Sequence, residues 1–181
     1  MDITKAGKVL LTRAKDVERY ALILKLYKNS SIVDDSDFQH KFNAFYRVRR
    51  GAEWRAVFYE IFAREKGSTP SFAMILNEIY QKTGNIEGSF TSKLLATINP
   101  NLPIWDQYVL KNIGLKVKET SKEEKLKNAV ELYGKMVDWY NDFLISTDGQ
   151  QCIAEFDKRF PQYSYFSEIK KADFILWCSR D

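Results

Sequence analysis

Cysteine and histidine are scarce in this sequence. The 181 residues include two cysteines, Cys152 and Cys178, and one histidine, His40, and their spacing is not that of zinc ligands. We therefore expect no metal site and two free, buried thiols. The sequence also lacks a Gly-rich phosphate loop and a nucleophile–histidine pair. This argues against a small-molecule enzyme, and we expect no cofactor.

Glycine and proline are also few, with eight and four residues, and no apolar run is long enough to span a bilayer. So few turn-forming residues argue against an all-β fold. Because a signal-type segment is also missing, we expect a cytoplasmic protein that makes no contact with a membrane. Aromatic residues are plentiful instead, and twelve Phe, ten Tyr and four Trp supply a sizeable core.

Apolar residues recur at three- and four-residue steps along most of the chain, which predicts an all-α fold. We expect one domain over residues 1–181, with about seven or eight helices in two packed halves. The N-terminal helical half covers residues 1–84, and the C-terminal half covers residues 85–181.

Local patterns predict the ends of several helices. The first helix is expected over about residues 4–28, because its apolar stripe continues without a glycine or proline that would end it. Ser121 and Glu124 match a capping box, which opens a long helix to about residue 145. The tract 147–150 is then expected to end this helix before the next one begins.

The net charge of +4 is unevenly distributed, since residues 1–66 hold 14 of the 28 basic residues but 9 of the 24 acidic ones. Arginines and aromatic residues interleave over residues 42–55. Guanidinium groups fit phosphate oxygens and aromatic rings stack on extruded bases, so this segment is a candidate nucleic-acid contact. Alternatively, the arginines complement a helix dipole and the rings fill the core. The candidate arginines are Arg47, Arg49, Arg50 and Arg55.

The central stretch, residues 88–114, predicts a short helix, a proline-containing turn and a second helix, and it holds Lys93 and Asp106. A carboxylate stabilises the positive charge that develops on a sugar as its base leaves, and a desolvated lysine can attack the sugar carbon to form a Schiff base. Taken singly, each residue also has a structural interpretation, with Lys93 exposed on a helix and Asp106 capping the next one.

Two segments of this stretch, Lys93-Leu-Leu-Ala and Leu102-Pro-Ile-Trp-Asp-Gln-Tyr-Val109, resemble the core of the helix-hairpin-helix DNA glycosylase superfamily. They are most similar to the 8-oxoguanine glycosylase-like branch and to short bacterial members with a degenerate hairpin. The resemblance implies a DNA partner, Asp106 as the catalytic aspartate and Lys93 as the nucleophile. Next to the aspartate, Trp105 or Tyr108 would stack on the base, with core packing as the other role for Trp105.

The chain departs from this family at the hairpin. The family has glycines two and four residues before its lysine, where backbone amides approach a phosphate, and this sequence has Thr91 and Ser89 there. The leading hypothesis is a DNA-binding, glycosylase-like protein that acts on a damaged base. The alternative is a non-catalytic helical module that binds nucleic acid or protein and has kept the fold without the activity.

Overall fold

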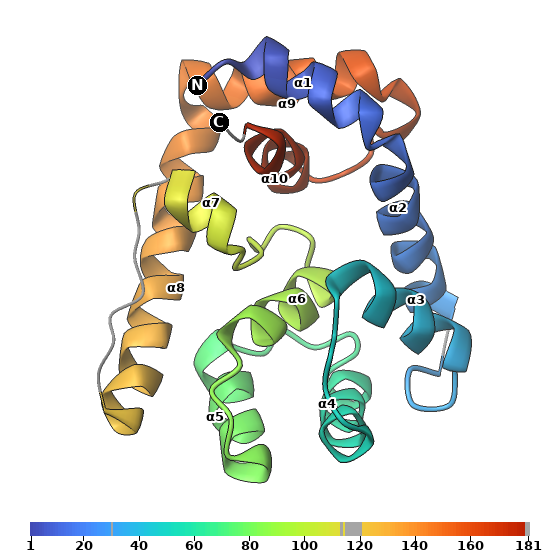
Figure 1. Cartoon of the computed structure of the whole chain (residues 1–181), viewed down its shortest axis with the longest axis vertical. Coiled ribbons are helices and arrows are strands. Elements are labelled where there is room, and N and C mark those ends of the chain that lie inside the picture. Colours follow the sequence, from blue (N-terminus) through green and yellow to red (C-terminus); the bar gives the residue numbers. More distant parts are fainter. Residues whose placement is uncertain (30, 113, 115–120, 180–181) are drawn as a thin grey trace. The chain divides into compact units, whose positions relative to one another are not determined.

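A computed structural model of the chain describes residues 1–29, 31–112, 114 and 121–179. Every regular element in these residues is a helix, which confirms the predicted all-α class (Figure 1). The elements are α1 (Ile3–Thr12), α2 (Ala14–Asn29), α3 (Ser36–Tyr46), α4 (Ala52–Arg64), α5 (Phe72–Thr83), α6 (Gly88–Ile98), α7 (Gln107–Asn112), α8 (Lys122–Ile145), α9 (Thr147–Arg159), the 3-10 helix η1 (Pro161–Tyr163) and α10 (Glu168–Cys178).

The described residues form ten α-helices, so the predicted number of seven or eight is wrong. One reason is that the helix expected over residues 4–28 is two helices. At Arg13 the backbone turns to φ −115° and ψ 22°, and its N–H bonds to the carbonyl of Leu10, three residues back. This tight turn ends α1, and α2 begins at Ala14 without a glycine or proline to mark the change.

The junction of α8 and α9 also differs from the prediction. Ser146 alone separates the two helices, and its hydroxyl accepts a hydrogen bond from the Gly149 N–H. We expected the tract 147–150 to separate the two helices, but it forms the first turn of α9. At the other end of α8 the capping box is confirmed, with reciprocal hydrogen bonds between Ser121 and Glu124.

The chain folds into two compact units. Unit 1 comprises Met1–Ala14 and Pro100–Asp181, and unit 2 comprises Lys15–Asn99. Unit 1 thus contains α1 and the helices from α7 onward, whereas α2 to α6 form unit 2. That the whole chain forms one domain with halves at 1–84 and 85–181 stays a prediction.

Unit 2 has an aromatic core. The rings of Phe38 and Phe42 on α3 meet those of Phe58, Tyr59 and Phe62 on α4, with the Phe42 and Phe62 centroids 5.5 Å apart. Such rings bury large areas and prefer the tilted and edge-on arrangements seen here. α5 packs on both α4 and α6, so this core fixes the helices that carry the arginines and Lys93.

Unit 1 is built around α10, which packs against α1, α7, α8 and α9 (Figure 1). All residues from Ile169 to Leu176 are buried, including three charged side chains. A helix covered on every side is normally apolar, so charges within it need partners inside the protein.

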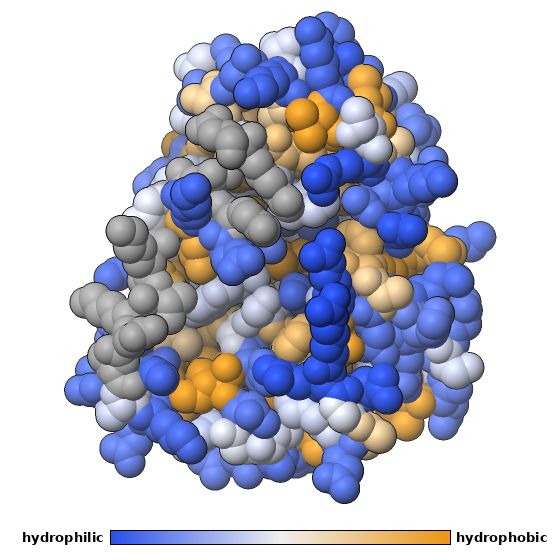
Figure 2. Space-filling model, in the orientation of Figure 1, coloured by the Kyte–Doolittle hydropathy of each residue, from blue (hydrophilic) through white to orange (hydrophobic). Residues whose placement is uncertain are grey.

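None of the described helices could cross a bilayer, since each is either too short or too polar. On the face drawn in Figure 2, hydrophilic residues predominate and apolar ones form small, separate groups. The aromatic and aliphatic residues serve mainly the two cores.

A glycine pair tests the α8–α9 corner. A Cβ at Gly149 would overlap the carbonyl oxygen of Phe143, whereas one at Gly134, within α8, would have no atom of another residue within 4 Å. We expect Gly149→Ala to lower the free energy of unfolding by about 1–3 kcal/mol, because backbone must move. Gly134→Ala should raise it by about 0.5–1 kcal/mol. Urea unfolding followed by circular dichroism measures both, and equal stabilities would contradict the close approach.

Candidate functional site

The link between α3 and α4, residues 47–51, carries three of the four predicted arginines. It begins at Arg47, which has φ 54° and ψ 48° and is the one non-glycine residue at positive φ in the described part of the chain. The N–H groups of Arg47 and Val48 both bond to the carbonyl of Asn43. Glycine is the usual residue at this left-handed position after a helix, because a Cβ is strained there.

Two contacts hold the link in place. Val48 is buried, and the Arg50 Nη2 atom lies 2.7 Å from Oε1 of Glu87, the residue that precedes α6. Arg47 and Arg49 are exposed and form no ion pair with the residues that the structure describes. A fixed backbone therefore presents two cations to solvent.

The fourth arginine, Arg55, lies apart from the link. It is half-buried in the first turns of α4, and its charge acts on Tyr59, one turn further along. Burial raises the pKa of the Tyr59 phenol, and Arg55 lowers it to a smaller extent. The Tyr59 hydroxyl donates to the Asn43 side chain at 2.8 Å. Arg55 thus contributes to the inner packing of α3 and α4 more than to the exposed group of cations.

Lys93 and Arg50 meet at one aromatic side chain. The Lys93 Nζ atom lies 4.9 Å from the centroid of the Phe90 ring and 5.7 Å from that of Tyr46. The Arg50 guanidinium lies 5.8 Å from the same Phe90 ring, and Trp54 packs against this ring at 5.2 Å. The faces of aromatic rings attract cations. The half-buried Lys93 therefore lies against the Phe90 and Tyr46 rings and does not simply extend into solvent.

Glu87 completes this group, and we did not predict it. It is 6% exposed and precedes the first residue of α6, yet its side chain makes no capping hydrogen bond. Burial raises the pKa of its carboxyl, and Arg50 and Lys93 act in the opposite direction to a smaller extent. No sequence pattern indicates this burial, because an acid before a helix is ordinarily exposed.

The positions of the family's hairpin glycines lie within α6. α5 ends at Gly84, which has φ 70°, and α6 begins at Gly88, so both Ser89 and Thr91 belong to its first turn. The Thr91 N–H donates to the Glu87 carbonyl at 2.8 Å, and the Thr91 side chain is fully buried. The amide of Thr91 is therefore used by the helix itself.

Asp106, in unit 1, directly precedes α7. Its carbonyl oxygen accepts the Leu110 N–H at 2.9 Å, which is the first hydrogen bond of the helix, and its side chain is half-buried. The preceding turn is fixed from α8, because the Tyr133 hydroxyl donates to the Pro103 carbonyl at 3.1 Å. Trp105 is half-buried beside it, and the side chain of Tyr108 lies outside the described residues.

A buried polar network that we did not predict lies in the same unit. The Tyr140 hydroxyl donates to Asp173 at 2.8 Å, and the Lys170 ammonium contacts the other carboxylate oxygen at 2.9 Å. Burial raises the pKa of Tyr140, and the negative charges of Asp173 and then Asp106 raise it further. Asp106 therefore opens α7 within the electrostatic field of this network.

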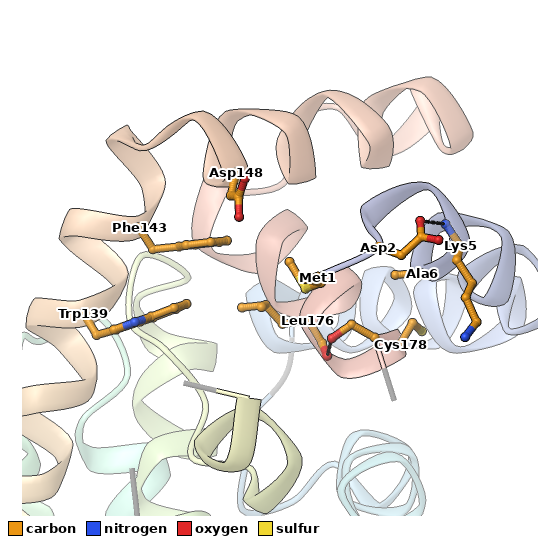
Figure 3. Close-up of a pocket in the computed structure, with 10 residues that line it drawn as sticks. Met1, Asp2, Lys5, Ala6, Trp139, Phe143, Asp148, Leu176 and Cys178 are labelled. Carbon is orange, nitrogen blue, oxygen red and sulfur yellow. Dashed lines mark hydrogen bonds between the residues drawn. The ribbon is translucent and has the colours of Figure 1, made fainter. Parts of the chain in front are cut away.

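A pocket of about 270 Å³ opens elsewhere in unit 1, lined by α1, α8, α9 and α10 (Figure 3). The rings of Trp139 and Phe143 stack along one side, with centroids 4.5 Å apart and planes 14° apart. Asp148 and Leu176 are among the other lining residues. Its volume is slightly below the range of about 300–1,000 Å³ typical of small-molecule sites. None of the predicted site residues lines it.

Both cysteines are buried and neither forms a disulfide, as predicted, and burial raises the pKa of Cys152 to about 12. Among the described residues, no three histidine, cysteine or acidic side chains lie close enough to hold a metal ion. Comparisons with protein-family models, curated proteins and solved structures gave no match. The resemblance to the glycosylase superfamily therefore rests on the residue pattern of the central stretch.

The buried network of unit 1 gives a stability prediction. Asp173→Asn should lower the free energy of unfolding by about 3–5 kcal/mol, because it leaves the Lys170 ammonium buried without its counter-charge. Tyr140→Phe should cost only about 1.5–3 kcal/mol, the value of a hydrogen bond to a charged group. Thermal and urea unfolding of both variants measure this order, and a larger loss for Tyr140→Phe would contradict it.

Proposed function

We propose that the chain is a DNA-binding, glycosylase-like protein that removes a damaged base. Unit 2 would bind the phosphate backbone through the link 47–51 and supply Lys93 as the nucleophile. Unit 1 would supply Asp106 to stabilise positive charge on the sugar. The observation that carries the proposal is the left-handed Arg47, an exposed cation at a position where glycine would be more stable.

The strain at Arg47 has no compensation in charge pairing within the described residues. A non-glycine residue in the left-handed region costs about 1 kcal/mol, and the exposed Arg47 forms no ion pair there. Backbone strain of this kind is concentrated at functional sites. Because guanidinium groups bind phosphate oxygens with two parallel hydrogen bonds, Arg47 and Arg49 on one fixed link support phosphate binding.

The group around Phe90 supports contact with an extruded base. Enzymes that act on a base turn it out of the duplex and hold it by stacking and hydrogen bonds, and single-stranded segments bind where cations and rings alternate. Phe90 is half-buried, with Lys93 and Arg50 against its ring.

Asp106 has the properties that charge stabilisation needs. It is a half-buried carboxylate that opens a helix after a turn fixed by Tyr133, so its position is held by the backbone on both sides. A preorganised negative charge stabilises a sugar cation more strongly in such a site than in water.

The alternative function is a non-catalytic nucleic-acid- or protein-binding module, and one observation favours it. The amide of Thr91, at one of the family's glycine positions, is bonded within α6. The phosphate contact of the family hairpin would then be missing. In that case the link 47–51 would still bind nucleic acid, while no base would be removed.

Replacing Arg47 separates binding from stability. Arg47→Gly should raise the free energy of unfolding by up to about 1 kcal/mol, because glycine tolerates positive φ, whereas Arg47→Ala should not raise it. Both should weaken DNA binding several-fold and reduce the slope of log affinity against log salt by about 0.9 for a duplex, since one phosphate contact is lost. Fluorescence anisotropy with labelled oligonucleotides at about 50–200 mM salt measures this.

The matched control for this prediction is Arg19→Ala, which removes an exposed cation that is paired with Asp16 on α2. Its salt slope should equal that of the wild type. A loss of stability in Arg47→Gly would contradict the strain argument. An unchanged salt slope in both Arg47 variants would contradict phosphate binding by the link.

Base removal is tested with duplexes that hold an oxidised, alkylated or deaminated base, incubated with borohydride. We expect a covalent adduct with at least one lesion, absent in Lys93→Ala, and a roughly 100-fold or greater loss of base release in Asp106→Asn. Asp138→Asn, an exposed acid on α8, is the control. If no lesion gives an adduct or an abasic product while binding persists, the non-catalytic module is the correct function.

A further inference from the structure

Glu87 lies where an acid is energetically costly. It is 6% exposed at the start of α6 and does not cap that helix. Its one ion-pair contact within the described residues is Arg50, at 2.7 Å, and the Arg50 side chain is itself largely exposed. A structural role would be expected to bring more hydrogen bonds to the carboxylate, because burying a charge requires them.

The charged groups around Glu87 include the proposed nucleophile. Arg50 contacts Glu87 from the link, and Lys93 lies in the second turn of α6. Both cations lie against the Phe90 ring, at 5.8 and 4.9 Å. The charge of Lys93 acts on the Glu87 carboxyl. Tyr46, at the end of α3, bounds the amine on another side, at 5.7 Å. Arg50 therefore links the two groups, because it contacts the acid and shares the Phe90 ring with the amine.

We propose that Glu87 is the proton-transfer residue for Lys93 when the amine captures a sugar aldehyde. The inference rests on the proposed function, because it assigns the proton that Lys93 must lose and the proton that the leaving hydroxyl must gain. It uses residues of unit 2 only, and the substrate class is the ring-opened aldehyde of an abasic site in DNA.

The reaction requires no group beyond Lys93, Glu87 and the aldehyde. The Lys93 ammonium gives a proton to the Glu87 carboxylate, and the amine lone pair forms a bond to the aldehyde carbon C1′. The carbonyl π electrons move to oxygen, which takes a proton from nitrogen and becomes a hydroxyl. The Glu87 acid then donates its proton to this hydroxyl, the C–O bond breaks and water leaves. The nitrogen lone pair forms the C=N bond, which leaves an iminium ion and the Glu87 carboxylate.

The environment of Glu87 suits this exchange. Burial raises the pKa of its carboxyl, against the smaller opposing effects of Arg50 and Lys93. A group whose pKa is closer to the working pH accepts and returns a proton more effectively, which contributes about 10²–10⁴-fold in rate.

The raised pKa of Glu87 also predicts how the stability of the fold depends on pH. A carboxyl with a raised pKa in the folded protein binds its proton more tightly when folded, so its ionised form destabilises the fold above that pKa. This destabilisation decreases as the pH falls from the raised pKa, and it is absent below the carboxyl's ordinary pKa. Glu87→Gln should therefore melt at the same temperature as the wild type or higher at pH 7–8, and this advantage should disappear in acid.

The decisive experiment measures Lys93 directly in the full-length protein, without DNA. Reductive methylation with formaldehyde and cyanoborohydride, followed by peptide mass spectrometry, gives the rate at each lysine. A carboxylate that acts by charge alone favours the ammonium, so its loss would speed labelling of Lys93. Loss of a proton-transfer residue would instead slow the labelling. We expect Glu87→Gln to lower the labelling rate of Lys93 at least tenfold. Exposed lysines such as Lys25, and the control Glu53→Gln on α4, should be unaffected.

A second arm uses a duplex with an abasic site and borohydride, from pH 5 to 9. Glu87→Gln should trap bound DNA at least tenfold more slowly and lose the acid limb of the pH profile. Arg50→Gln should move that limb to higher pH, because it removes a charge that lowers the Glu87 pKa. A purely structural role of Glu87 would not move the limb.

The two experiments distinguish failure of the role of Glu87 from failure of the proposed function. Unchanged or faster labelling of Lys93 in Glu87→Gln overturns the role of Glu87, whatever happens with DNA. Slower labelling supports it, even if the wild type traps no DNA. That last result would instead contradict the proposed function.

Discussion

The ion pair between Arg50 and Glu87 joins the link after α3 to the start of α6, and the candidate site of unit 2 depends on it. Val48 anchors the middle of the link in the core, and the ion pair joins its far end to the start of the helix that carries Lys93. It therefore sets the position of two exposed arginines and, through Phe90, the surroundings of the amine. Because the carboxylate is buried and the guanidinium is not, solvent stabilises one partner far more than the other.

Unit 1 shows the contrasting solution to buried charge. On α10, Lys170 and Asp173 are both buried, and Tyr140 supplies a further hydrogen bond to the carboxylate. Each charged group there has a partner of opposite sign or a donor, as the interior of a protein requires. Glu87 has the less complete set of contacts. A buried acid with few partners and a raised pKa is more typical of functional sites than of structural ion pairs.

Local signals in the sequence predicted much of the fold and less of the site. The all-α class and the capping box at Ser121 follow from periodicity and caps, which depend on neighbouring residues alone. The break at Arg13 does not, because the apolar stripe continues across it and neither glycine nor proline marks it. The arginines form a cluster in the sequence, but Glu87, the ion-pair partner of Arg50, lies 37 residues further along the chain, and spacing alone does not pair the two.

The division of the candidate residues between units bears on how the two hypotheses differ. Capture of an aldehyde needs an amine, a proton-transfer group and a phosphate contact, and Lys93, Glu87 and the link 47–51 all belong to unit 2. Breaking the bond between base and sugar needs a charge that stabilises the sugar cation, and Asp106 belongs to unit 1. The two activities are therefore separable in principle. A chain that captures abasic sites without releasing bases would keep the chemistry of unit 2 alone, which is an outcome between a complete glycosylase and a binding module.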